Sequence, residues 1–372
     1  MSALRVALVA GPMYDHLYRI FEPGEVEVVV HADHPTLNRT VAAMLAGGER
    51  IDVLATHSKY APSQAAWLLD LDELLDPEVG RALAPAAVDL CRYRGIQWCL
   101  PRLIDVRVLW WRRDRLPEPP ERWSDLLAGS AVFGFTGRES GAFGTFFELV
   151  AAEGGRLFDD DLRPCFDSEP ARQALRTMQT LADRAPADLP DWHYDDVDRA
   201  LLEGRVDLAA AWPGAWGALR SSALADLLVP SRYPAGTARR VSYSGCHAWA
   251  VPRTCGDVPG AVALVERLLG AEAQAIDAAG GSVCAHRAAF AAVIPSSDTD
   301  ARRLEITRRT IEESMITYPP LRRFPEVEDA GWSMIQEVLR HRATPEGALE
   351  RMQHAAELVL DDPSADPEGH HR

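Results

Sequence analysis

Two tryptophans near the middle of the chain carry the clearest chemical signal. Trp212 and Trp216 flank the helix- and strand-breaking residues Pro213 and Gly214, directly after an apolar run at 206–211 that we interpret as a buried strand. Ligands of open α/β sheets bind beyond the carboxyl ends of strands, so both rings could face such a crevice. An indole combines a flat apolar face with one N–H group, which suits a sugar ring. The alternative is that both rings only fill a core, because large aromatic side chains are mostly buried.

A neighbouring cysteine and histidine are the best lead toward covalent catalysis. Cys246 precedes His247, and a thiolate is activated by an adjacent base. Neighbouring residues on a strand point to opposite faces, so we expect no hydrogen bond between these two side chains. The chain contains no phosphate-binding G-x-x-x-x-G-K-[ST] loop and no H-E-x-x-H motif, and residues 137–141 miss the spacing of a G-x-S-x-G elbow. We therefore predict no catalytic residues.

Residue types that ligate metals lie close together at His31, Asp33 and His34, where a predicted strand ends. Zinc needs four suitably spaced ligands, and this stretch has no matching partner group. The histidine pair at 370–371 is not interpreted as a metal site either. The six cysteines are scattered and form no C-x-x-C pair, which favours buried reduced thiols over a disulfide framework. We expect neither a metal nor another cofactor.

Length, charge and apolar runs limit the possible classes of function. With 372 residues the chain exceeds the usual size of a single core, so we expect two domains. A formal net charge of −16 opposes binding to nucleic acid or to anionic membranes, because phosphate contacts need clustered lysines and arginines. The early apolar run at 6–10 is too short for a secretory signal. As given, the chain is expected in the cytoplasm; if a leader was removed, it is periplasmic or otherwise extracytoplasmic.

In the first third of the chain, strands alternate with helices, which predicts a parallel sheet flanked by helices. We expect strands at 5–10, 26–31 and 51–56, and a helix at 37–45. Two further strands, at 96–100 and 106–111, are separated by residues 101–105. Because this segment begins with Pro101, we interpret it as a bend or crossover.

A second alternating unit begins with a strand at 131–135 and a helix at 142–153. Ser168 is expected to cap the next helix, which has Pro170 in its first turn. The rest of the chain is predicted to be mostly helical, and its polar end, 361–372, is expected to fray. The late helices are expected at 259–269, 271–279, 302–315, 327–341 and 345–360.

The order of these segments resembles the solute-binding proteins of ATP-driven sugar importers, the group that includes maltose-binding proteins. The resemblance extends over residues 4–360. The matching pieces are residues 123–127, 154–155, 166–168, 200–204, the turn at 212–216, residues 244–245 leading to 250–252, residues 271–275 and residues 344–349.

This resemblance implies a two-lobed α/β fold of the type II periplasmic-binding-protein class. Each lobe is then a mainly parallel sheet flanked by helices, and the lobes close by a hinge motion around a ligand held between them. By position, residues 1–107 plus 243–300 form one lobe, and residues 108–242 plus 301–372 form the other. The implied partners are a sugar, polyol or uronate ligand and the permease subunits of an ABC importer, and the implied state is a monomer.

The same resemblance implies a set of ligand-binding residues in the cleft. Asp105 and Arg107 could hold neighbouring hydroxyl groups, although they could equally pair with each other. His57 and His247 could donate or accept hydrogen bonds, or could be structural. The full predicted set is Met13, Tyr14, His57, Ser58, Asp105, Arg107, Phe135, Thr136, Trp212, Trp216, Gly245 and His247.

Two alternatives to an importer component remain open. One is a cytoplasmic enzyme built on the same two-lobed fold, because function must be argued from a site and not from a fold. The other is a cytoplasmic sensor that binds a sugar and passes the closed state to a partner protein.

Overall fold

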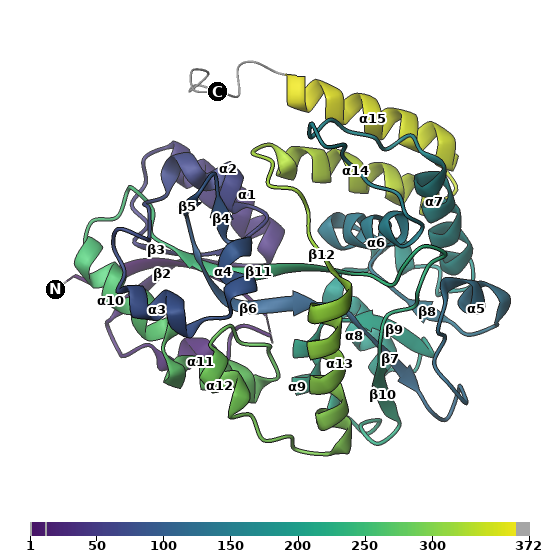
Figure 1. Ribbon diagram of the computed structural model, residues 1–372, viewed down its shortest axis with the longest axis horizontal. Helices are drawn as coiled ribbons and strands as arrows, with labels where there is room; N and C mark the ends of the chain where they lie inside the picture. Colours follow the sequence, from purple (N-terminus) through teal and green to yellow (C-terminus); the bar gives the residue numbers. More distant parts are fainter. Residues whose placement is uncertain (1, 12, 362–372) are drawn as a thin grey trace.

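The strands of the protein form two main sheets, one in each lobe (Figure 1). The computed structural model describes residues 2–11 and 13–361, so the predicted tail at 362–372 lies outside the described residues. The first sheet contains β2 (Val26–Ala32), β1 (Leu4–Val9), β3 (Val53–His57) and β11 (Ser242–Ala250), with β12 (Met315–Ile316) and β6 (Leu100–Val106) both paired to β11. The second sheet has the order β10 (Leu228–Ser231), β7 (Val108–Arg112), β9 (Leu208–Ala211) and β8 (Phe133–Gly134). A small hairpin joins β4 (Arg92–Tyr93) to β5 (Ile96–Gln97).

Both sheets are mixed. Strand β1 pairs in parallel with β2 and β3, whereas β11 runs antiparallel to β3 and β6. In the second sheet β8 and β9 are parallel, and β7 is antiparallel to β9 and β10. The parallel pairs β1–β2, β1–β3 and β8–β9 join strands that the alternation of strands and helices predicts. The expectation of a mainly parallel sheet in each lobe is wrong for the second sheet, because β7 pairs antiparallel with both of its neighbours.

Helices cover both sheets, and each lobe has its own apolar core. Among the described residues, no helix has both the length and the apolar composition needed to cross a membrane. The first lobe contains α1 (His34–Ala46), α2 (Ala61–Gln64), α3 (Pro77–Ala82), α4 (Pro85–Leu90), α10 (Val258–Leu269), α11 (Ala271–Gly280) and α12 (Arg287–Ala291). The second contains α5 (Trp123–Ala128), α6 (Glu139–Ala152), α7 (Glu169–Ala182), α8 (Tyr194–Leu202), α9 (Trp216–Leu219), α14 (Phe324–Leu339) and α15 (Pro345–Asp361), while α13 (Asp298–Ser314) touches strands of both sheets.

Local sequence signals place several of these helices. The Ser168 hydroxyl accepts a hydrogen bond from the backbone N–H of Ala171, as predicted for the start of α7. The buried side chains of α7 recur at helical spacing and pack into the core of the second lobe. The expected late helices are all present, within a few residues of their predicted ends.

The prediction of a bend at residues 101–105 is wrong, because this segment is part of strand β6. Strand β6 pairs with β11 in the sheet, and its other side is bonded through Arg102 and Ile104 to residues 283–285, which belong to no named strand. Pro101 therefore lies at the border of the sheet, where a proline is tolerated. The register between β6 and β11 also shifts between His247 and Ala248, and Ala248 lies opposite Pro101. The irregular ladder therefore accommodates the proline without ending the strand.

The chain passes from the first sheet to the second at Arg107, which separates β6 from β7. The Ser242 hydroxyl accepts a hydrogen bond from the Arg107 backbone N–H at 2.8 Å and donates one to its carbonyl oxygen at 2.9 Å. Since Ser242 begins β11, which follows β10 of the second sheet, two crossings of the chain are bound to each other here.

Trp216 lies in the core of the second lobe, where it is only 3 % exposed. Its ring stacks on that of Trp110 on β7, with 5.6 Å between the ring centroids. Strand β9 ends at Ala211, and Trp216 is the first residue of the short helix α9. The structure thus supports the core-filling alternative for this tryptophan.

We predict that Trp216→Ala lowers the free energy of unfolding by about 3–5 kcal/mol, because it leaves a large cavity beside Trp110. Chemical denaturation followed by circular dichroism measures this change. An unchanged midpoint would contradict the placement of Trp216 in the core.

Candidate functional site

A cavity lies between the two lobes and is lined by residues of both. Its volume is about 90 Å³. The first lobe contributes residues from the carboxyl ends of the parallel strands β1, β2 and β3, as expected for an open α/β sheet. The lining residues are Ala10, Gly11, Met13, Tyr14, Asp33, His34, His57, Lys59, Asp105, Ser140, His193, Tyr194, Asp195, Trp212, Tyr243 and His247.

Imidazole and carboxylate groups from three strands meet on the first-lobe side of the cavity. His247 on β11 lies opposite His57 on β3. Gly245, two residues before His247 on the same strand, lies opposite Asp105 on β6. The Nε2 atom of His247 is 3.0 Å from a carboxylate oxygen of Asp105 and 2.9 Å from the Tyr14 hydroxyl. The ring of His34 contacts both other imidazoles, with centroids 5.2 Å from His57 and 4.9 Å from His247.

Burial keeps several of these groups uncharged. It lowers the pKa of His34 and of His57 well below the ordinary value of a histidine, and a positive charge on His247 or Lys59 would lower both further. Burial likewise raises the pKa of Tyr14 well above that of a free phenol. The cavity therefore presents neutral rings and a neutral hydroxyl, which can each donate or accept hydrogen bonds.

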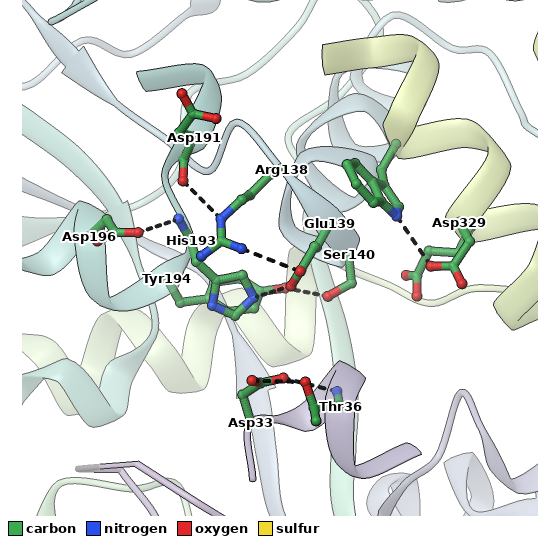
Figure 2. Close-up of polar contacts among 12 residues, drawn as sticks. Asp33, Thr36, Arg138, Glu139, Ser140, Asp191, His193, Tyr194, Asp196 and Asp329 are labelled. Atoms are coloured by element: carbon green, nitrogen blue, oxygen red, sulfur yellow. Dashed lines mark hydrogen bonds and ion pairs between the residues drawn. The ribbon is translucent and has the colours of Figure 1, made fainter. Parts of the chain in front are cut away.

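The wall from the second lobe is built at the starts of two helices (Figure 2). The Ser140 hydroxyl, in the first turn of α6, lies 3.2 Å from the Tyr194 hydroxyl at the start of α8. His193 caps α8, and its backbone N–H donates to the Asp196 carboxylate at 2.7 Å. Figure 2 shows these residues across from Asp33, whose carboxylate accepts a hydrogen bond from the Thr36 backbone at the start of α1.

Trp212 lies where the sequence predicted a stacking surface, directly after β9 and in the cavity wall. Tyr194 and Tyr243 contact it edge to face, with centroids 5.9 and 5.8 Å away. The guanidinium of Arg107 lies over the ring, 5.7 Å from its centroid. These contacts hold the indole in one orientation.

Half of the predicted binding set lines this cavity, namely Met13, Tyr14, His57, Asp105, Trp212 and His247. Arg107 does not, because its side chain is buried against Glu148 and Thr145. The considered pair between Asp105 and Arg107 is absent from the described contacts, since Asp105 pairs with His247.

The other predicted residues support the wall from behind or lie in the core. Phe135 stacks on Phe133 in the second-lobe core, and Thr136 packs tightly on Gly141. The Ser58 hydroxyl accepts a hydrogen bond from the Cys246 backbone N–H at 3.0 Å. Gly245 lies against the His57 ring, where an added Cβ would be 2.1 Å from a ring carbon. With Trp216 in the core, these residues lie outside the lining of the cavity.

The lining residues at the starts of helices were not predicted from the sequence. Asp33 and His34 were considered only as part of a metal cluster with His31, but His31 turns away to bond Asp15 at 2.9 Å. The remaining missed residues are Ala10, Gly11, Lys59, Ser140, His193, Tyr194, Asp195 and Tyr243. Those from helix starts follow a recognisable signal, since a helix that begins beside a strand's carboxyl end directs its first residues toward the crevice.

Cys246 and His247 point to opposite sides of β11, as the alternation of a strand predicts. The Cys246 thiol is fully buried in the first-lobe core, 3.8 Å from the carbonyl oxygen of Ala87, while His247 lines the cavity. No hydrogen bond between the two side chains is present among the described residues. The geometry therefore does not provide an activated thiolate at the cavity.

We predict that His34→Phe makes stability less dependent on pH below about 6.5. Because burial lowers the pKa of His34, the unfolded chain takes up a proton in this range that the folded protein does not, so the free energy of unfolding falls as pH falls. The variant should lose up to about 1.4 kcal/mol of this fall per pH unit. Urea denaturation between pH 5 and 7 measures both slopes, and equal slopes would contradict the prediction.

The chain was compared with known families and structures. Residues 13–275 match the family model described as bacterial extracellular solute-binding protein. The structure is similar to maltose-bound T. maritima MalE3, with a TM-score of 0.86 and 20% identity, covering 96% of this chain and 100% of that one. It is also similar to the GacH receptor of Streptomyces glaucescens GLA.O (TM-score 0.82, 18% identity, 97% and 99% covered). A third match is a solute-binding protein of Agrobacterium radiobacter K84 in complex with ribitol (TM-score 0.84, 17% identity, 96% and 98% covered).

These similarities extend over nearly the whole of each chain and agree with the two sheets, the two cores and the cavity between them. At this level of identity the solved structures establish the two-lobed fold, while the family model covers most of the sequence. The chain belongs to the bacterial extracellular solute-binding protein family.

Proposed function

We propose that the protein reversibly binds one small polyhydroxylated molecule, a sugar, polyol or uronate, in the cavity between its lobes. In this proposal it is the substrate-binding component of an ABC importer, and its lobes close around the ligand. Three similar structures support the ligand class, since they hold maltose, ribitol and α-D-tagatose. The observation that carries the proposal is the meeting of Trp212 from one lobe with Asp105 and His247 from the other.

The chemistry of the cavity fits such a ligand on two sides. The fixed ring of Trp212 offers an apolar face for the C–H groups of a sugar or polyol. The Asp105 carboxylate accepts hydrogen bonds from hydroxyl groups, and the hydroxyls of Tyr14 and Tyr194 can donate or accept. Because the binding groups come from both lobes, only the closed protein makes all of these contacts.

The size of the cavity favours a compact ligand. Its volume of about 90 Å³ is well below the roughly 300–1,000 Å³ of pockets that hold drug-sized ligands. This space suits a monosaccharide or a short polyol better than an oligosaccharide. Reversible capture for transport is expected to give a dissociation constant near 1 μM, about 8 kcal/mol of binding free energy.

A buried ion pair ties the lobes together beside the cavity. The ammonium group of Lys59, which follows β3, lies 2.9 and 3.1 Å from the two carboxylate oxygens of Glu328 on α14. The two side chains are only 5 % and 3 % exposed, and the Tyr60 hydroxyl also donates to this carboxylate. Opening of the lobes would separate these groups, so the pair favours the closed conformation.

We predict that Trp212→Ala weakens binding of the best ligand by about 1 kcal/mol or more, because the stacking face is lost. Isothermal titration calorimetry with a panel of sugars, polyols, uronates and sugar phosphates identifies that ligand and measures the change. Trp332→Ala is the matched control, since Trp332 is a partly buried tryptophan of α14 that does not line the cavity. Equal affinity in the wild type and in Trp212→Ala would contradict the role of Trp212 as a stacking surface. Conversion of the ligand to a product on chromatography would favour the enzyme alternative.

We predict that Glu328→Gln shifts the protein toward the open form, because it leaves the buried Lys59 without its countercharge. Small-angle scattering should give a larger radius of gyration without ligand, and the affinity for the ligand should fall several-fold. Glu337→Gln, which removes a more exposed carboxylate from the same helix, serves as the control. A radius of gyration that ligand does not change in the wild type would argue against hinge closure.

A further inference from the structure

Two imidazoles and a carboxylate converge on one side of the cavity. Donor atoms of His57, Asp105 and His247 all lie within 4.8 Å of one another. The three residues are 4 %, 6 % and 7 % exposed, and they come from the adjacent strands β3, β6 and β11. The hydrogen-bonded ladders of the sheet hold them in place, so the cluster is a built feature of the first lobe.

The Asp105 carboxylate has no arginine or lysine to balance its charge within the described part of the chain. Arg107 is paired with Glu148, and Lys59 is paired with Glu328. The one ion-pair contact of Asp105 is with the His247 ring at 3.0 Å. A buried carboxylate is costly without a cationic partner, so this position favours the binding of an additional positive charge.

Some ring nitrogens of the imidazoles around Asp105 have no hydrogen-bond partner among the protein groups. The Nδ1 atom of His247 is buried without a hydrogen-bond partner, and both ring nitrogens of His34 are in the same condition. The contacts of His247 with Asp105 and with Tyr14 are both made by its Nε2 atom, so Nδ1 is the ring nitrogen left without a partner. The Nδ1 atom of His57, in contrast, accepts a hydrogen bond from the Lys59 backbone N–H at 3.2 Å.

We propose that His57, Asp105 and His247 bind one divalent transition-metal ion of the class of Zn²⁺, Co²⁺ or Ni²⁺ in the cavity. Two nitrogen donors and one carboxylate oxygen are a ligand set that suits these ions and disfavours Mg²⁺ and Ca²⁺. Tetrahedral bonds of 2.0–2.1 Å separate ligand atoms by about 3.3 Å, so the Asp105 and His247 atoms are already near this spacing. Small side-chain rotations would bring His57 to the same ion.

Three protein ligands leave a fourth position on the side of the cavity. A water molecule, or an oxygen of a bound hydroxylated or carboxylated molecule, would take that position. This metal site shares Asp105 and His247 with the proposed ligand-binding cavity, but its ligands are protein groups that need no sugar to bind the ion. If both are correct, the ion would contribute to the selection of ligands with a chelating pair of oxygens.

The test is titration of the full-length protein, freed of metal by a chelator and dialysed, with Zn²⁺ and with Co²⁺. All proteins in the series carry His370→Ala and His371→Ala, so that the histidine pair at the end of the sequence does not add a site. We expect one ion per chain, with a dissociation constant at or below the micromolar range. The visible spectrum of bound Co²⁺ should show the intense bands of four-coordinate geometry.

Asp105→Asn and His247→Gln should each weaken Zn²⁺ binding at least ten-fold, while His31→Gln, beyond the cavity, should leave it unchanged. Thermal unfolding checks that each variant is folded. The proposal is overturned if the wild type binds no ion, if Co²⁺ gives only a six-coordinate spectrum, or if both site variants keep wild-type affinity. The last two results would mean that the ion binds elsewhere on the chain.

A sugar titration with and without chelator separates this inference from the proposed function. Sugar binding by a protein that takes up no metal would overturn the metal site alone. Stoichiometric metal binding by a protein that binds none of the ligand panel would overturn the proposed function alone.

Discussion

The buried ion pair between Arg107 and Glu148 is the constraint on which the rest of the site depends. Arg107 is the residue at which the chain leaves one sheet and enters the other, and Glu148 lies on α6 of the second lobe. The Glu148 carboxylate also accepts a hydrogen bond from the backbone N–H of Tyr243 on β11. The guanidinium in turn lies over the ring of Trp212. One charged group therefore ties together both crossings of the chain and the aromatic wall of the cavity.

A buried ion pair of this kind contributes more to specificity than to stability, because the desolvation of two charges offsets much of their attraction. Here the geometry it specifies is the position of Trp212 relative to the first lobe. The two sides of the cavity then have different tasks. The second lobe supplies an aromatic face and hydroxyl groups, whereas the first lobe supplies imidazoles and one carboxylate.

Much of the fold could be predicted from the sequence, because it is encoded by local patterns. Apolar runs, glycine stops and helix caps such as Ser168 located the strands and helices, and their order identified the family. The exceptions depend on tertiary context. Pro101 lies within a strand because that strand is at the border of the sheet beside an irregular ladder, and no local signal reports this.

The site was predictable only in part, since position along a strand does not determine what a side chain meets. Trp212 and Trp216 are four residues apart and follow the same strand, yet one ring lines the cavity and the other stacks on Trp110. Arg107 was predicted to bind the ligand, but its guanidinium is paired with Glu148, which lies 41 positions later in the sequence. The cluster of His57, Asp105 and His247 joins residues up to 190 positions apart, so only the register of three strands brings it together.

The most direct measurement of the central claim is a crystal structure of the protein with the tightest ligand found in a titration panel. We predict one small hydroxylated molecule between the lobes, stacked on Trp212 and hydrogen-bonded to Asp105, with Lys59 still paired to Glu328. Ligand density outside this cavity, or a ligand that contacts only one lobe, would contradict it.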